Sequence, residues 1–260
     1  DYQGLITYAN EQIALWGISP QAYHFFSELN REYEINLQVA EWREEYVYLN
    51  SRQAASDCLK ELIASNSEIS SALIPRFFTT LNDIEKYVEQ SPYSLLAKAP
   101  YSSSGRGLLW LPLGGLTRTE QQILHGMLKK QGAVSVEKVL DKQIDFAMEF
   151  IADGKGNIGF VGYSLFETNK KGAYMGNYIG AQKNIEAMLN DKIGIAVLNK
   201  IKKDLIRVLK EKYASLYKGC IGVDMMIYKD EKEENTLHPC VEINMRSNMG
   251  LLAFKISEKY

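Results

Sequence analysis

The sequence is poor in cysteine and histidine. Its cysteines are too few for a disulfide framework and contain no Cys-x-x-Cys pair of metal ligands: Cys58, Cys220 and Cys240. The histidines lie too far apart along the chain to indicate a catalytic triad or a three-histidine metal site: His24, His125 and His238. Scarce, unpaired cysteine is typical of a reduced, intracellular setting, so we expect a cytoplasmic protein.

No sign of charge dominates, and long hydrophobic runs are missing. The 30 Lys and Arg residues against 32 Asp and Glu residues give a net charge of −2, which excludes the electrostatic signature of a general nucleic-acid binder. No stretch reaches 18 uncharged residues, so a membrane-spanning helix is excluded. No basic segment followed by an apolar one indicates a secretory signal. Because the chain starts with Asp1, we expect a processed protein or one whose true start is missing.

What is present is ordinary globular material. The 260 residues are 46% hydrophobic and 24% charged, enough for one large unit or two subdomains. Strands and helices alternate without strict βαβ order, which favours α+β subdomains over a single doubly wound sheet. Residues 167–181 read as a loop, and Asn82 is a candidate helix cap. Helices are expected over 21–33, 51–64, 83–90, 119–131 and 194–217, and strands over 76–79, 93–97, 108–113, 133–140, 144–151, 158–166, 219–228 and 238–246.

The segment LLAKAPYSSSGRG, residues 95–107, predicts a hairpin with a soft tip. Glycine lets the backbone approach a ligand closely, and successive N–H groups can hold anionic oxygens. Lys98 and Arg106 add positive charge suited to phosphate. Few apolar anchors predict a mobile lid. The alternative is a flexible hairpin tip with solvated charges, and the segment is neither a Walker A loop nor a dinucleotide fingerprint.

The last predicted hairpin is the most informative segment. Side chains of a strand alternate between two faces, so Glu242, Asn244 and Arg246 share one face. The other face carries an apolar set directed at a core: Val241, Ile243 and Met245. A turn centred near Glu233 places Asp224 opposite Glu242, and two opposed carboxylates repel. Together with the Asn244 carbonyl they predict a site for Mg²⁺ or Mn²⁺. The alternative is that Arg246 merely neutralises acids on a solvated face.

Two further acids flank the connection between two middle strands. Glu137 ends an apolar strand, and Asp145 begins the next. A hinge backbone with a carboxylate eight residues on could hold the edge of an adenine and a pair of ribose hydroxyls. The alternative is two solvated acids beside a loop.

In their order along the chain, these segments resemble the ATP-grasp superfamily. The matching segments are LLAKAPYSSSGRG, VEKVLDKQID, GVDMM and EINMR, and the resemblance covers about residues 50–250. It implies an α+β protein with the ATP-grasp fold, in which two α+β subdomains grip ATP between them. Residues 1–50 would be a short or incomplete N-terminal pre-ATP-grasp region, 51–140 the lid subdomain with its lead-in helix, and 141–260 the C-terminal subdomain carrying the metal site.

The resemblance also implies roles for individual residues. Lys98 would bind the nucleotide phosphates and act in catalysis, Asp145 would hold the ribose, and Arg246 would hold the acyl-phosphate. The lid over the phosphates would be Ser102, Ser103, Ser104, Gly105, Arg106 and Gly107. The adenine hinge would be Glu137, Lys138, Val139 and Leu140. The ligands of two Mg²⁺ ions would be Asp224, Glu242 and Asn244.

The implied activity is an ATP- and Mg²⁺-dependent ligase. A carboxylate would be activated as an acyl-phosphate and then attacked by an amine or a thiol. The expected partners are small-molecule carboxylate and amine substrates, with no nucleic acid and no membrane, and a homodimer is an expected assembly. Two alternatives stay open: a small-molecule kinase on the same scaffold, and a nucleotide-binding protein without turnover.

Overall fold

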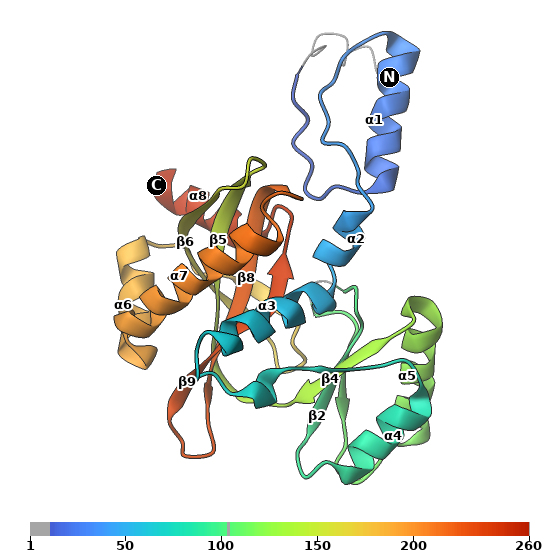
Figure 1. Ribbon diagram of the computed structural model, residues 1–260, viewed down its shortest axis with the longest axis vertical. Coiled ribbons are helices and arrows are strands. Elements are labelled where there is room, and N and C mark those ends of the chain that lie inside the picture. Colours follow the sequence, from blue (N-terminus) through green and yellow to red (C-terminus); the bar gives the residue numbers. More distant parts are fainter. Residues whose placement is uncertain (1–10, 103–104, 260) are drawn as a thin grey trace.

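The structure is a computed structural model that describes residues 11–102 and 105–259. It contains two antiparallel sheets, each covered by helices, and a helical N-terminal region that projects from the end remote from the smaller sheet (Figure 1). This arrangement confirms the predicted α+β class. None of the helices in the described ranges is long and apolar enough to cross a membrane.

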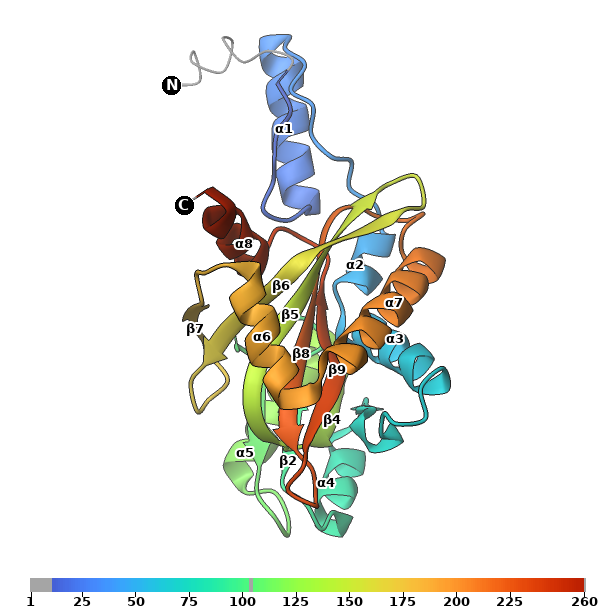
Figure 2. The ribbon, with the colours of Figure 1, turned by 90° about the vertical axis from the view of Figure 1, so that its left-hand side faces the viewer.

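The large sheet has the strand order β7-β6-β5-β8-β9. Its strands are β5 (Asp141–Asp153), β6 (Ile158–Thr168), β7 (Tyr174–Asn177), β8 (Lys218–Lys229) and β9 (Asn235–Asn244). The helices α3 (Arg52–Ala64), α6 (Gln182–Ile193) and α7 (Ile195–Lys212) pack on one face (Figure 2). The C-terminal helix α8 (Met249–Lys259) packs against β5, β6, β7 and β8.

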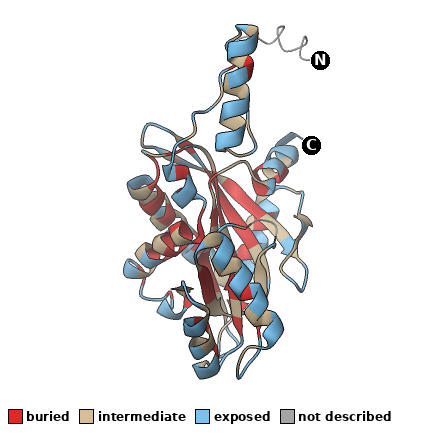
Figure 3. Cartoon of the chain, turned by 90° about the vertical axis from the view of Figure 1, so that its right-hand side faces the viewer, coloured by how far each residue is buried: buried red, intermediate tan, exposed pale blue. Residues whose placement is uncertain are grey.

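Strict alternation along β5 and β8 divides this sheet into an apolar face and a polar one. Phe146, Met148 and Phe150 of β5 are buried in the core beneath the helices, together with the odd-numbered residues 221–227 of β8. The opposite face carries Asp145 and Glu149 of β5 and Asp224 and Met226 of β8, which line a cleft. The strands of the large sheet therefore carry much of the buried area seen in Figure 3.

The smaller sheet has the order β1-β4-β2-β3. Its strands are β1 (Arg76–Phe78), β2 (Leu95–Lys98), β3 (Leu108–Leu111) and β4 (Val134–Lys138), and it is preceded by a 3₁₀ turn, η2 (Ser71–Leu73). The helices α4 (Leu81–Gln90) and α5 (Arg118–Gln131) form a separate small core with it. Lys98 leaves this core and faces the large sheet because Leu95 and Ala97 occupy the other face of β2.

The N-terminal region has little core of its own. Helix α1 (Pro20–Tyr33) is capped by Ser19, whose hydroxyl accepts a hydrogen bond from the amide of Ala22, and it buries Leu29 alone. The short helix α2 (Glu45–Leu49) leads directly into α3. A single parallel bridge joins Gln12 to Gln38, so residues 11–50 form no complete βαβ unit.

Local differences from the sequence prediction have identifiable causes. Helix α4 is capped by the Thr80 hydroxyl, two residues before the predicted Asn82. The predicted loop over 167–181 contains β7, a four-residue edge strand too short to show alternation. Helices α6 and α8 lie in segments for which no helix was predicted, and α7 ends at Lys212 rather than 217.

The last hairpin reaches the predicted pairing by an unexpected route. Asp224 lies opposite Glu242, as predicted, but the turn is centred on residue 232 because Lys229 pairs with Asn235. A bulge compensates: Met225 alone stands opposite the three residues 239–241 of β9. The bulge also turns Val241 into the cleft, so the prediction that Val241 faces the core is wrong, while Ile243 and Met245 are buried as expected.

Helix α3 belongs structurally with the large sheet although the small sheet follows it in sequence. It packs against β9 and α7, and Cys58, Leu59 and Leu62 join the core of the large sheet. Residues 76–138 are therefore inserted between α3 and β5. The division at residues 50 and 140 stays a prediction.

Candidate functional site

A cleft of about 420 Å³ lies between the two sheets, at the ends of β2 and β4 and over the polar face of β5, β8 and β9. It brings together eleven of the residues predicted for nucleotide, metal and catalysis, from segments far apart in the sequence. They are Lys98, Gly105, Glu137, Lys138, Val139, Leu140, Asp145, Asp224, Glu242, Asn244 and Arg246.

The rest of the predicted lid is not brought into this cleft. Ser102 lines a neighbouring pocket, whereas Arg106 is exposed, and neither Arg106 nor Gly107 lines either cavity. Ser103 and Ser104 lie outside the described residues. The described tip of the lid touches the other subdomain: Gly105 has φ +74°, and a Cβ there would lie 2.3 Å from the carbonyl oxygen of Gly172. Glycine is thus required at 105 both for its backbone conformation and for the close approach.

The wall formed by the small sheet carries a charge pair whose lysine is buried and whose carboxylate is partly exposed. The Lys98 ammonium forms an ion pair with the Glu137 carboxylate, and Lys98 is 5% exposed. The two residues come from neighbouring strands, since Lys98 pairs with Ser135 and Leu96 with Glu137. Glu137 therefore holds the amine at the cleft surface, where an anionic ligand would compete for it. The role of Glu137 at an adenine hinge stays a prediction.

The opposite wall concentrates negative charge. Asp224 and Glu242 face each other across β8 and β9, and Glu149 lies on the adjacent strand β5. Burial, and after it the negative charges of Glu242 and Glu149, raise the pKa of Asp224 well above its usual range. Repulsion among these carboxylates opposes the ionisation of Asp224, and a bound cation would stabilise its ionised form.

An amide and a guanidinium continue this wall. The Asn244 amide donates to Asp224 Oδ2 at 3.1 Å, and Arg246 donates to Asn244 Oδ1 at 2.7 Å. The Asn244 oxygen, predicted as a metal ligand, therefore accepts from Arg246 in this structure. The prediction that Asn244 and Arg246 project to one side with Glu242 is confirmed, because all three line the cleft.

The predicted ribose carboxylate is already hydrogen-bonded at the far side of the cleft. Asp145 Oδ2 accepts from Thr168 Oγ1 at 2.7 Å and from the Lys142 ammonium at 2.5 Å. Its side chain is one-tenth exposed. These contacts fix the carboxylate beside the hinge segment 138–140, and its binding of a ribose stays a prediction.

No family model and no curated protein matches the sequence. Solved structures do match, at low identity. One is N5-carboxyaminoimidazole synthetase from Staphylococcus aureus complexed with ADP, with 15% identity and a TM-score of 0.54. This match covers 95% of this chain and 57% of that protein. The biotin carboxylase domain of Hydrogenobacter thermophilus 2-oxoglutarate carboxylase, crystallised with MgADP, ADP and bicarbonate, has 13% identity, a TM-score of 0.60, and coverages of 98% and 55%.

A third neighbour extends the comparison. D-alanine–D-alanine ligase from Helicobacter pylori has 13% identity and a TM-score of 0.51, with coverages of 90% and 64%. All three neighbours are ATP-grasp enzymes, and each match covers at least nine-tenths of this chain. This chain has the ATP-grasp fold. It spans little more than half the length of the first two neighbours and under two thirds of the third.

Within the ATP-grasp fold, the acidic wall suits one kind of cation. Two carboxylates and an amide oxygen are hard ligands, and Mg²⁺ commonly takes one or two carboxylates and completes its shell with phosphate oxygens and water. In the part of the chain that the structure describes, no group of three or more His, Cys, Asp or Glu side chains is placed to hold a metal by itself. Asp224, Glu242 and Asn244 would therefore leave coordination positions of such an ion open to ligands from outside the protein.

Sequence reasoning missed Arg52, which ties the ATP-grasp lid to the acidic wall. Its guanidinium donates to the Ala99 carbonyl and to Ser102 Oγ, both at 3.0 Å, and lies 3.3 Å from Glu242 Oε2. The side chain is 9% exposed. Arg52 follows the N-cap Ser51 of α3, a position where helices commonly carry exposed polar residues, so no sequence pattern identifies it.

Glu149 was also missed, although the sequence contains a signal for it. It is the single charge in the run FAMEFIA of β5 and is 2% exposed. Its carboxylate accepts from Ser164 Oγ at 2.9 Å and from the Asn248 amide at 2.8 Å. Burial raises the pKa of Glu149. The buried Glu149 carboxylate is thus satisfied by two hydrogen bonds, and it forms part of the floor of the cleft.

His238 lines the same ATP-grasp cleft and is 5% exposed. Burial lowers the pKa of His238 to about 4, so the imidazole is neutral at physiological pH. Its Nδ1 accepts a hydrogen bond from the amide of Cys240 at 3.4 Å. A neutral, hydrogen-bonded imidazole thus forms part of the cleft wall.

Proposed function

We propose that this protein is an ATP- and Mg²⁺-dependent ligase that activates a carboxylate as an acyl-phosphate for attack by an amine or a thiol. One observation carries the proposal: in an ATP-grasp fold, a buried lysine on one wall of a cleft faces a carboxylate pair on the other. Two structural neighbours were crystallised with ADP or MgADP, which supports a nucleotide in the corresponding place here.

The cleft offers a distinct environment for each part of Mg·ATP. Apolar side chains, including Leu140 and Phe166, line the end beside the hinge segment 138–140 and would receive the adenine, with Asp145 near the ribose. Lys98 and the lid would hold the phosphates. Asp224, Glu242 and Asn244 would hold Mg²⁺, which when bound neutralises negative charge on the phosphate oxygens.

The chemistry follows from this placement. A carboxylate oxygen of the substrate attacks the γ-phosphorus of ATP, the bond to the β-γ bridging oxygen breaks, and ADP leaves. Lys98 stabilises the charge that spreads over the transferred phosphoryl group. An amine or thiol then attacks the carbonyl carbon of the acyl-phosphate, and inorganic phosphate and a proton are released. The lid keeps water out so that the intermediate is not hydrolysed.

A test separates this ligase from a kinase on the same scaffold. Purified protein with Mg·ATP and a panel of carboxylic acids should release ADP, and added hydroxylamine should trap the acyl group as a hydroxamate. A kinase would release ADP with hydroxyl substrates and yield no hydroxamate. A protein without turnover would bind Mg·ATP and release nothing.

Glu242→Ala tests the metal site directly. The change should reduce metal-dependent turnover by about a hundredfold or more, since an interaction with the charge of the transition state is lost. Glu234→Ala, in the exposed turn of the same hairpin, is the matched control and should behave as wild type. Unchanged Mg·ATP affinity and activity in Glu242→Ala, measured by calorimetry and ADP release, would refute the assignment.

A further inference from the structure

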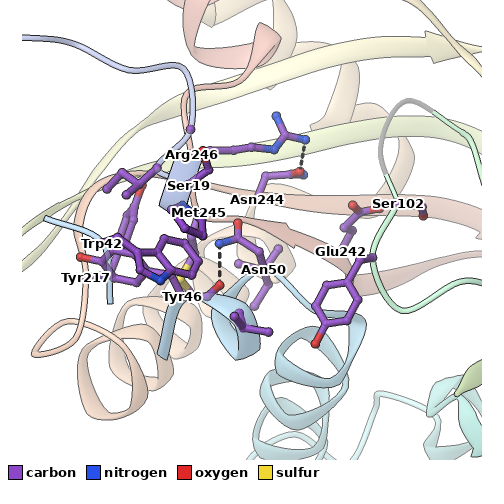
Figure 4. A pocket seen from close by; sticks show the side chains of 16 residues that line it. Ser19, Trp42, Tyr46, Asn50, Ser102, Tyr217, Glu242, Asn244, Met245 and Arg246 are labelled. Atoms are coloured by element: carbon purple, nitrogen blue, oxygen red, sulfur yellow. Dashed lines mark hydrogen bonds between the residues drawn. The ribbon is translucent and has the colours of Figure 1, made fainter. Parts of the chain in front are cut away.

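A second pocket of about 430 Å³ lies beside the nucleotide cleft and shares Glu242, Asn244 and Arg246 with it. Its other walls come from segment 17–20, helix α2, Ser102 of the lid and Tyr217. Figure 4 shows the aromatic side chains Trp42 and Tyr217 gathered at one end, and Glu242 and Ser102 at the other. We call this cavity the aromatic pocket.

The lining combines three packed aromatic rings with two charged side chains. Trp42 packs edge-to-face on Tyr46 with ring centroids 5.7 Å apart, and Tyr46 packs in the same way on Tyr217 at 6.0 Å. Among the lining residues, which all lie in the described ranges, Glu242 and Arg246 alone are charged. A ligand that fits this lining has an apolar or aromatic body and one ionised end.

The part of the N-terminal region that lines this pocket is held by contacts with the large sheet and with the segment after β9. The amide of Ser247, just after β9, donates to the Trp16 carbonyl at 2.9 Å. Ile18 packs on the core of the large sheet, and Gly17 lies against Arg246, whose Cβ would be 3.7 Å from a Cβ placed on the glycine. Residues 16–18 therefore close this pocket against the end of β9.

Arg246 decides which end of a ligand lies at the boundary between the two cavities. Its guanidinium donates to two uncharged acceptors, Asn244 Oδ1 at 2.7 Å and the Ser247 carbonyl at 3.3 Å. Glu242, by contrast, is already paired with Arg52 at 3.3 Å. At the boundary, therefore, Glu242 already has a partner of opposite charge, whereas Arg246 has no carboxylate among its hydrogen-bond partners. The remaining N–H donors of Arg246 suit a carboxylate.

We propose that the aromatic pocket holds the acid that the ligase activates, a carboxylic acid with an aromatic or bulky apolar body. Its carboxylate reaches Arg246 and its body lies among Trp42, Tyr46 and Tyr217. This inference rests on the proposed function for the reaction, but the binding of such an acid can be measured without turnover.

The test uses the full chain saturated with Mg·ADP and three probes in calorimetry: 3-phenylpropionate, 3-phenylpropylamine and succinate. The aromatic acid should bind about tenfold or more tightly than the amine, which has the same body, and than succinate, which has the charge but no aromatic body. Equal binding of either comparison probe, or no binding of 3-phenylpropionate, would overturn the proposal.

Blocking the pocket supplies the second arm. Val47 lines it from the exposed face of α2, whereas Glu45 of the same helix does not. Val47→Trp should weaken 3-phenylpropionate about tenfold or more, while Glu45→Trp should not, and both should bind Mg·ATP as wild type does. Unchanged acid binding in Val47→Trp would refute the pocket. Failure of the wild-type protein to bind Mg·ATP, with acid binding retained, would refute the proposed ligase and leave the pocket standing.

Discussion

Single charged residues in the cleft are each held by a particular neighbour. Lys98 is paired with Glu137, Arg52 with Glu242, and Arg246 is oriented by the oxygen of Asn244. Such contacts fix a side chain before a ligand arrives, which lowers the entropy that binding must overcome. The cleft therefore presents its charges in preset positions on both walls.

Arg246→Lys tests this positioning. A lysine keeps the positive charge but offers neither the planar pair of N–H groups nor the contact to Asn244. We expect turnover to fall about a hundredfold while Mg·ATP affinity changes little, because the contact is strongest once charge has moved onto the acyl-phosphate. The exposed Arg118→Lys is the control. Wild-type turnover in Arg246→Lys would remove Arg246 from the chemistry.

At this scale the sequence predicts residues that share one strand or one hairpin. Glu242, Asn244 and Arg246 follow from alternation alone, and Asp224 from the pairing of the hairpin. Arg52 does not follow, because its partners Ala99 and Glu242 stand far from it in the chain and only the folded structure brings them together.

Among the elements, the lid hairpin and the loop between β6 and β7 make the contact that closes one end of the cleft. Both sides of this contact are glycines, Gly105 at φ +74° and Gly172 at φ +78°. A Cβ on Gly172 would lie 2.6 Å from Leu108 of the lid hairpin. The two loops therefore approach as closely as they do because neither carries a side chain at the contact.

Gly105→Ala should separate the two loops. Alanine at a positive φ costs about 1 kcal/mol of strain, and its methyl would clash with the Gly172 carbonyl. Gly114→Ala is a matched control, since Gly114 has φ +83° and a Cβ added to it would meet nothing within 4 Å. Both variants should lose stability in urea unfolding, Gly105→Ala more because of the clash, but only Gly105→Ala should lose turnover, by about tenfold. Equal turnover in the two variants would show that the contact has no role in closing the site.

Elements are predictable where local rules act alone. Helices α1 and α3 begin within one residue of the starts predicted at 21 and 51, and apolar spacing over 194–217 predicted α7. Strand β7 and the bulge before Glu242 were not predictable, because a short edge strand and an extra residue in a ladder depend on the neighbouring strand. The pairing of Asp224 with Glu242 was predicted correctly through a misplaced turn that the bulge offset.

For the molecule as a whole, one buried histidine makes stability depend on pH. His238 is neutral in the fold, since burial lowers its pKa from 6.5 to about 4. The unfolded chain binds a proton as pH falls below about 6.5, whereas the folded chain does not until about 4. The stability it contributes is therefore fully present above pH 6.5 and is lost as pH falls from 6.5 to 4.

Urea unfolding at pH 8 and pH 5 measures this effect. The wild-type protein should lose about 2 kcal/mol more than His238→Asn between the two values. Asparagine retains a carbonyl that can accept the Cys240 amide but carries no titrating group. An identical pH dependence in the two proteins would mean that the pKa of His238 is the same in the folded and the unfolded chain.

Local sequence patterns do not predict how the two sheets are placed relative to each other. The small and large sheets have separate cores, and no local pattern states how they face each other. Their arrangement was anticipated through the resemblance to ATP-grasp proteins, not through composition or periodicity. The packing of α3 on the large sheet had no local signal at all.

The insertion of residues 76–138 has an evolutionary consequence. The inserted segment begins and ends on adjacent antiparallel strands, with Arg76 opposite Val136, so the chain leaves the large sheet and returns to it at neighbouring points. A segment with adjoining ends can be lengthened, shortened or exchanged without altering the strand order of its host. The lobe that carries Lys98 can therefore change in length without altering the strand order of the lobe that carries Asp224 and Glu242, so insertions and deletions should be tolerated within residues 76–138 more readily than within β5 or β8.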